Sequence, residues 1–208
     1  MAGLKDVLSY VPAYVALQKA LGADKLRYRC LAELGLRGGE TVLDVGCGPA
    51  YYRDRLPRVR YYGFDTSERY IEWARKRWAG RGEFRCEVLG EQHRAELPPA
   101  DAVLLLGLLH HLSDDESRVL LDVAASALAP GGRVIAVDTC YEPNQGRISR
   151  WMSRNDRGEY VREPEGFVKL AQASFADVDG VVLDDVTRVP SSFWMMKMRE
   201  PLTASARP

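Results

Sequence analysis

The residues best suited to chemistry lie together in the segment 41–49, TVLDVGCGP. An apolar run there carries one acid, Asp44, and is followed by two glycines, Gly46 and Gly48, on either side of Cys47. Glycine has no Cβ, so backbone N–H groups in such a turn can approach a nucleotide-like ligand closely. The segment predicts a buried strand, a tight turn and a cofactor site at the start of the next helix.

Two kinds of cofactor fit such a turn, and the third glycine position of the dinucleotide fingerprint separates them. In G-x-G-x-x-G the last glycine packs the helix on the strand, and the helix N-terminus receives the pyrophosphate. Tyr51 stands at that position here. It would crowd a pyrophosphate, and the charge of Asp44 would repel one, so the pattern favours a cationic ligand. An NAD(P)-dependent oxidoreductase is the less favoured alternative.

The motif V-L-D-V-G-C-G-P resembles the first motif of the class I S-adenosylmethionine-dependent methyltransferases of the small-molecule type. Later segments resemble further motifs of that family, in the order that its fold requires. They are 59–65 (VRYYGFD) for the second strand, 101–112 (DAVLLLGLLHHL) for the fourth strand and the segment beyond it, and 130–134 (PGGRV) for the turn into the fifth. The resemblance covers roughly residues 38–138 and implies S-adenosyl-L-methionine as the cofactor.

The resemblance also implies which residues bind that cofactor. Asp65 ends the second predicted strand, 19 residues after Gly46, where a carboxylate can accept hydrogen bonds from ribose hydroxyls. The family's common Asp-Ala segment for the adenine is missing, and Glu87 is the candidate there, with Glu91 as the alternative. The expected cofactor-binding residues are Asp44, Gly46, Cys47, Gly48, Asp65, Thr66, Glu87, Leu106 and Gly107.

Two adjacent histidines are the candidates for catalysis. Methyl transfer needs an aligned acceptor and a group that removes its proton. His110 and His111 follow the fourth predicted strand, and histidine titrates near neutral pH. The resemblance aligns His111 with a histidine that is frequent in the family, so His111 is the first candidate base and His110 the second. A structural role in holding loops together is the alternative for both.

The segment after the fourth strand also bears on the methyl acceptor. Family members that methylate base amines or glutamine side chains carry N/D-P-P-Y/F there, whereas this chain has LGLL at 106–109. This leaves oxygen, carbon and ordinary amine atoms of a small molecule. A protein that binds the cofactor without catalysis is the alternative.

The segment 146–157 carries four arginines at helical spacing. If it is helical, one of its faces either binds an anionic acceptor or is solvated, and that face carries Arg147, Arg150, Arg154 and Arg157.

Composition narrows the class of protein further. The chain has 208 residues, enough for one domain, with 29 Lys+Arg and 29 Asp+Glu. A balanced charge does not favour a nucleic-acid partner, so we expect a small-molecule acceptor and a monomer or homodimer. No apolar run reaches the ~20 residues of a membrane helix. No metal-ligand spacing involves the histidines or cysteines, so no metal is expected. The lack of a signal-peptide pattern predicts the cytoplasm.

Alternating strand and helix patterns predict an α/β fold. Five strands are expected at 41–46, 60–64, 84–88, 102–106 and 134–138, with helices at 67–78 and 113–128. The resemblance implies a Rossmann-like class I methyltransferase fold. It adds an antiparallel C-terminal hairpin, from 178–186 and 193–199, to give a seven-stranded, mostly parallel sheet with helices on both faces.

We expect a single domain with four parts. They are an N-terminal helical cap (1–37), a cofactor-binding core (38–138), a substrate-side insertion (139–162), and a C-terminal helix with edge strands (163–208). The helices of the cap are expected to break at Pro12 and Gly22. His93, in the loop after the third strand, is expected on the surface.

Overall fold

The computed structural model describes residues 10–202, except for the side chains of residues 94 and 95. Its centre is a seven-stranded sheet with the order β3-β2-β1-β4-β5-β7-β6. The strands are β1 Thr41–Val45, β2 Arg60–Asp65, β3 Glu83–Cys86, β4 Ala100–Leu106, β5 Leu128–Thr139, β6 Phe175–Leu183 and β7 Phe193–Pro201. The first five are parallel and β7 is antiparallel to both β5 and β6. The predicted sheet and its edge hairpin are confirmed.

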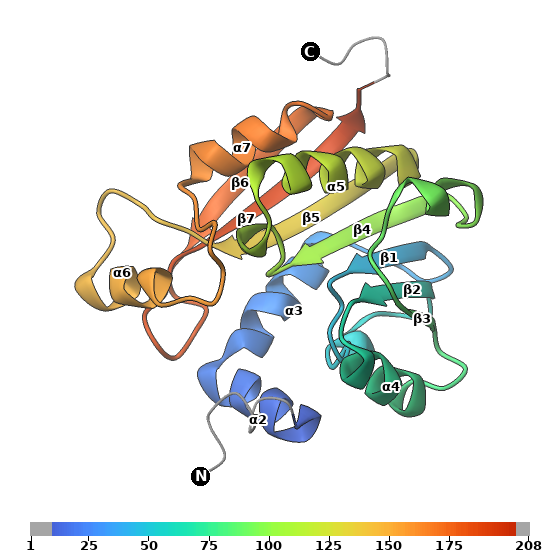
Figure 1. Cartoon of the computed structure of the whole chain (residues 1–208), viewed down its shortest axis with the longest axis horizontal. Helices are drawn as coiled ribbons and strands as arrows, with labels where there is room; N and C mark the ends of the chain where they lie inside the picture. Colours follow the sequence, from blue (N-terminus) through green and yellow to red (C-terminus); the bar gives the residue numbers. More distant parts are fainter. Residues whose placement is uncertain (1–9, 203–208) are drawn as a thin grey trace.

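Helices cover both faces of this sheet (Figure 1). They are α2 Val11–Leu21, α3 Ala23–Glu33, α4 Glu68–Arg77, α5 Asp114–Ala127, α6 Arg147–Arg154 and α7 Pro164–Ala171, with short 3₁₀ turns η1 Arg53–Arg55, η2 Glu91–Ala95 and η3 Leu109–His111. One buried cluster joins the sheet to α3 and α4, for example through Leu31 and Ile71. A second cluster joins the other face to α5 and α7, for example through Leu121 and Phe167. The sheet is therefore the middle of three layers.

The continuous apolar strands follow from burial on both faces. Neighbouring side chains of a strand point to opposite faces, and Val42 lies in the cluster with α3 while Leu43 lies in the cluster with α5. Strands that are buried on both faces do not alternate apolar and polar residues, so their sequences are continuous apolar runs, as in other parallel sheets. The one acid in the buried strand β1, Asp44, therefore needs polar partners inside the protein.

Local signals fix most helix ends. Ser113 caps α5: its Oγ accepts from the Glu116 N–H at 3.3 Å, and Glu116 accepts from the Ser113 N–H at 2.8 Å. The predicted break at Gly22 is confirmed, with φ of 81° between α2 and α3. Pro12 lies in the first turn of α2, so a helix begins there; a helix before it, which the predicted break at Pro12 implies, would lie outside the described residues. Proline is favoured there since that N–H has no helical partner anyway.

The insertion after β5 carries α6 beyond the carboxyl end of that strand (Figure 1). The buried side of α6 is polar: Gln145 Nε2 donates to Ser149 Oγ at 3.0 Å and to Ser153 Oγ at 2.9 Å. Ser149 Oγ in turn lies 2.9 Å from Ser192 Oγ. Hydrogen bonds thus hold this helix next to the chain that leads into β7.

Candidate active site

The predicted site residues meet at the carboxyl ends of neighbouring strands. In the sheet β1 lies between β2 and β4, so the segments that follow these three strands lie side by side at one edge. The order of the strands reverses between β1 and β4, and ligands of open α/β sheets bind at such a switch point. The tertiary fold thus brings together the glycine turn, Asp65 and the two histidines.

The turn after β1 has the backbone that its glycines predict. Gly46 and Gly48 have φ values of 70° and 53°, in the left-handed region that glycine adopts without strain. The N–H groups of Gly46 and Cys47 both donate to the Phe64 carbonyl, at 2.8 and 3.0 Å. A Cβ on Gly46 would lie 3.1 Å from Leu108 Cδ1, whereas one on Gly48 would meet nothing nearer than Tyr70 at 4.0 Å. The turn is packed on one side and open at Gly48.

Asp65 ties β2 to this turn. Its Oδ2 accepts from the Gly48 N–H and its Oδ1 from the Ser67 N–H, each at 2.8 Å. Ser67, and not Asp65, is the N-cap of α4, while the predicted neighbour Thr66 is exposed. A carboxylate offers about four acceptor positions, so the half-buried Asp65 keeps acceptor capacity for further donors.

Asp44 lies in a closed environment inside the sheet, as the predicted burial of its strand requires. Its side chain is fully buried, and the hydroxyls of Tyr52 and Tyr61 donate to it at 3.0 and 2.5 Å. Burial raises the pKa of Asp44 to about 7, against the opposing effect of these hydrogen bonds. The sequence analysis missed both tyrosines, because each becomes a partner of Asp44 only through tertiary packing.

Arg27 is a third residue near this turn that no sequence pattern marked. It lies on α3, with its guanidinium 5.3 Å from the ring centroid of Tyr51 and 5.8 Å from that of Tyr52. Its Nη1 donates to Gln18 Oε1 at 3.2 Å, but its buried Nε has no partner among the described residues. The positive charge of Arg27 opposes the rise in the pKa of Asp44, so the two side chains form part of one electrostatic unit beneath the turn.

The segment after β4 covers the glycine turn. Leu106 is buried at the end of the strand, and the Gly107 N–H donates to the Val137 carbonyl at 2.7 Å. Gly107 has a φ of 77°, which lets the chain turn sharply into η3. Both residues lie at the carboxyl edge of the sheet, where the resemblance to the methyltransferases implies the methionine end of the cofactor.

His110 is held by two carboxylates. Its Nδ1 lies 2.7 Å from Asp138 Oδ1 and its Nε2 lies 3.1 Å from Asp156 Oδ1. Burial by itself would lower the pKa of His110, but the two carboxylates raise it to about 9. A ring with both nitrogens bonded and a proton retained at pH 7 is a poor base, so this geometry suits His110 to linking β5 with the insertion.

His111 has the opposite environment. Its side chain is exposed, and its ring stacks on that of His110 with centroids 4.1 Å apart. Partial burial and the charge of His110 lower its pKa. None of the described residues forms a hydrogen bond with its ring nitrogens. A neutral imidazole with unengaged nitrogens is the form that can accept a proton.

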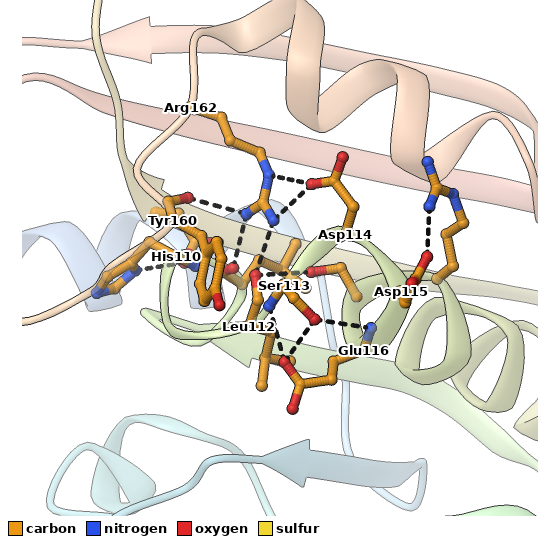
Figure 2. A network of polar contacts seen from close by, with 12 residues as sticks. His110, Leu112, Ser113, Asp114, Asp115, Glu116, Tyr160 and Arg162 are labelled. Atoms are coloured by element: carbon orange, nitrogen blue, oxygen red, sulfur yellow. Dashed lines mark hydrogen bonds and ion pairs between the residues drawn. The ribbon is translucent and has the colours of Figure 1, made fainter.

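Arg162 fixes the turn that carries both histidines (Figure 2). Its guanidinium donates to the carbonyls of Leu109 at 2.9 Å and Leu112 at 2.7 Å, and it also binds Asp114 Oδ1 at 2.8 Å. The Tyr160 N–H donates to the His110 carbonyl at 2.9 Å. The insertion therefore holds η3 in place from outside. No local sequence pattern marks Arg162, which is about 50 residues from its partners.

The loop after β3 buries His93, which was expected on the surface, and brings it against Glu87, the candidate for contact with the adenine. His93 is 3% exposed, not on the surface, and its Nδ1 accepts from the Gly90 N–H at 3.0 Å. Its Nε2 lies 3.3 Å from Glu87 Oε1. Glu87 is exposed beyond the end of β3, which stops at Cys86 and not at residue 88. Its role toward the adenine stays a prediction.

The arginine stripe of the insertion is exposed, as a solvated face would be. Arg147, Arg150 and Arg154 lie on the outer side of α6, and Arg150 Nη2 donates to the Glu142 carbonyl at 3.0 Å. The helix ends at Arg154, so the expected helical position of Arg157 is wrong. A role for the stripe in binding an acceptor stays a prediction.

Two absences hold for the part of the chain that the structure describes. In residues 10–202 no helix is long and apolar enough to cross a membrane. Within the same residues, no three or more His, Cys, Asp or Glu side chains gather in a way that could hold a metal ion.

Comparisons with known proteins agree with this arrangement. A family model described as a methyltransferase domain matches residues 42–132. A probable tRNA methyltransferase 9B of Mus musculus is 30% identical over 54% of this chain and 24% of its own length. A ubiquinone/menaquinone biosynthesis C-methyltransferase UbiE of Desulfotalea psychrophila is 34% identical over 67% of this chain and 55% of its own length. The chain thus spans about half or less of the length of these relatives.

A solved structure shows the same fold. Human N-acetylserotonin methyltransferase in complex with SAM superposes with a TM-score of 0.67 over 95% of this chain and 56% of its own, at 16% sequence identity. The family, the fold and the cofactor that the motifs predict are confirmed at the level of the family. Residues 42–132 thus carry the methyltransferase domain of the class I S-adenosylmethionine-dependent methyltransferases, a family of enzymes whose cofactor is S-adenosyl-L-methionine, and the chain has the fold of that family.

Proposed function

We propose that this protein transfers a methyl group from S-adenosyl-L-methionine to an oxygen, carbon or amine nitrogen of a small molecule. The observation that carries the proposal is the hydrogen bond of 2.8 Å between the Gly48 N–H and Asp65 Oδ2, beside η3 with its two histidines. It joins the glycine turn and the acid of the next strand into one site at the switch point of the sheet, where such ligands bind.

The residues of this edge fit the proposed cofactor. A Cβ on Gly48 would point into space with no atom nearer than 4.0 Å, so the glycine leaves room for a ligand against the backbone. Asp65 retains acceptor capacity for two hydroxyls after its two backbone contacts. Gly46, Gly48 and Asp65 would hold the cofactor, with Leu106 and Gly107 along its other end. When bound, it supplies an electrophilic methyl group on a positively charged sulfur.

His111 is the proposed base. Its lowered pKa keeps the imidazole neutral at pH 7, and its position after β4, at the carboxyl edge of the sheet, supports a place beside the proposed acceptor. His110 keeps the turn in place through Asp138 and Asp156, which lie against both of its ring nitrogens. This difference favours His111 as the base and His110 as a positioning residue.

The loop after β4 supports the proposal of a small-molecule acceptor. Leu106-Gly107-Leu108-Leu109 offers no side-chain amide or hydroxyl to an exocyclic amine. One relative is named a tRNA methyltransferase, so RNA belongs among the acceptors to be tested. The cytoplasm remains the predicted location.

Two measurements test the proposal. Calorimetry with S-adenosylhomocysteine should show one site per chain, and NAD and NADP should not compete for it. A panel of small-molecule alcohols, phenols, enols and amines should then be screened for release of S-adenosylhomocysteine, with a transfer-RNA pool as the contrasting acceptor. Binding without release in any arm would identify a cofactor-binding protein and contradict catalysis. No binding would contradict the whole site.

A further inference from the structure

A cavity of about 720 Å³ opens at the opposite edge of the sheet from the proposed active site. It lies where β2 and β3 begin, and is lined by four arginines together with Tyr61 and Tyr62. Asp65 lies at the other end of β2, about 16 Å away for a strand of this length. Ligands of drug or nucleotide size occupy cavities of about 300–1,000 Å³, so the volume suits a bound molecule that is separate from the cofactor.

The wall of this cavity is strongly positive. Its charged lining residues are Arg53, Arg58, Arg60, Arg81 and a single acid, Glu83. Glu83 is already paired, since its Oε1 lies 2.6 Å from Arg85 Nε. No ion pair joins any of the four arginines to an acid of the described residues. The formal net charge of the chain is zero, so this excess is a local feature.

The burial of Arg53 is a second, independent observation that points to a bound anion. It is only 2% exposed, and it lacks an acidic partner. Its Nη2 donates to the carbonyls of Arg81 at 2.9 Å and Val59 at 3.4 Å. Its guanidinium lies 5.1 Å from the ring centroid of Tyr61, while its Nε and Nη1 have no hydrogen-bond partner among the described residues. Burial and the charge of Arg81 lower its pKa. A buried cation with two unpaired donors is costly, and an anion held beside it would offset that cost.

We propose that this cavity, the arginine cavity, binds a phosphate ester. Guanidinium groups pair with phosphate oxygens in bidentate fashion, and several unpaired arginines around one cavity suit a group with more than one negative charge. The half-buried Tyr62 and the apolar Leu56 and Val59 provide a surface for the organic part of the ester. The ester belongs either to a free nucleotide or to the backbone of RNA, and the two share this chemistry.

Titration of the full chain with adenosine monophosphate, and separately with a short single-stranded RNA, tests the proposal. The indole signal of Trp78 reports locally in NMR spectra, since the guanidinium of Arg81 lies 5.2 Å from the Trp78 ring. The variant Arg58→Gln/Arg81→Gln changes two exposed side chains that have no ion pair. We expect it to bind either probe about tenfold more weakly, because charge-assisted contacts are lost.

Arg118→Gln/Arg199→Gln is the matched control. It removes the same charge from exposed arginines on α5 and β7 and should keep wild-type affinity for the probes. RNA bound much more tightly than the nucleotide, with a strong salt dependence, would identify a nucleic-acid backbone as the source. Similar affinities would identify a free nucleotide.

Equal weakening in both double variants, or unchanged affinity in Arg58→Gln/Arg81→Gln, would overturn the arginine cavity as a site. Binding of S-adenosylhomocysteine should be unaffected by either double variant. The result is therefore independent of the proposed methyl transfer.

Discussion

The two edges of the central sheet differ in the charges that they carry. The carboxyl ends of β1, β2 and β5 carry Asp44, Asp65 and Asp138, while β3 ends with Arg85 and Cys86. At the amino edge the arginine cavity collects four guanidinium groups beside Glu83. Strand β2 shows the contrast by itself, since it begins at Arg60 and ends at Asp65. A formal net charge of zero thus conceals an uneven distribution of charge, and such a distribution can steer charged ligands.

The two edges also differ in how their charges are satisfied. Each acid of the carboxyl edge has donors within the protein: backbone N–H groups for Asp65, tyrosine hydroxyls for Asp44 and His110 for Asp138. Two nitrogens of the Arg53 guanidinium have no hydrogen-bond partner among the described residues. The acids of the carboxyl edge are therefore held in place by the protein itself, whereas the proposed anion would add acceptors at the amino edge.

The largest expected effect falls on turnover at the carboxyl edge. His111→Gln should lower the rate of methyl transfer by about 100-fold or more, because a positioned base contributes about that much. The rate of the wild type should already be near its plateau at pH 7, since the pKa of His111 is lowered. Release of S-adenosylhomocysteine between pH 6 and 9, with an acceptor from the panel, measures both. An unchanged rate would remove His111 as the base.

Asp65→Ala should have the next largest effect, on affinity for the cofactor. It removes at least two charge-assisted hydrogen bonds to hydroxyls and should weaken binding about 100-fold. Calorimetry with S-adenosylhomocysteine measures the loss. Asp54→Ala, at an exposed aspartate of η1, is the control and should retain wild-type affinity. Equal affinities in the two variants would contradict the assignment of Asp65.

His110 should make stability depend on pH. Its pKa is raised to about 9 from an ordinary value of 6.5, so the folded state binds the proton more tightly than the unfolded state. This stabilisation is complete below about pH 6.5 and is lost as the pH rises through about 9. The loss should be roughly 3 kcal/mol. Urea unfolding at pH 6 and 9.5 should show a much smaller difference for His110→Gln than for the wild type.

Asp44→Asn should weaken cofactor binding by about tenfold, through the loss of one charge near a cationic ligand. It should also change the response of stability to acid. The pKa of Asp44 is raised to about 7, so the wild type loses stability as the pH rises from about 4 to 7. The variant should lose less over the same range in thermal unfolding. A pH response equal to that of the wild type would contradict the buried carboxyl group.

The smallest expected effect comes from the amino edge. Arg81→Gln should leave the affinity for S-adenosylhomocysteine within about twofold of wild type, because screening at this separation leaves little interaction between the two edges. The same calorimetric titration as for Asp65→Ala checks this. A loss of affinity as large as that of Asp65→Ala would show that the two edges form one site, and it would contradict the distinction between them.

Local patterns in the sequence were enough to predict the parallel strands and the glycine turn. Gly46 and Gly48 lie within one short segment, and their positive φ values follow from the backbone that a tight strand–turn–helix requires. The capping box at Ser113 was predictable for the same reason, since both partners lie three residues apart. Alternation of strands and helices predicted the α/β class, and the resemblance to the methyltransferases implied the sheet with its edge hairpin.

Tertiary contacts determine which of the two histidines is bound by carboxylates and where arginines without ion pairs gather. His110 and His111 are neighbours of the same type, yet Asp138 and Asp156 reach one of them and leave the other. The arginine cavity joins residues from η1, β2 and the turn before β3. Such environments depend on contacts between segments far apart in the chain, and no local pattern encodes the burial and charge that those contacts create.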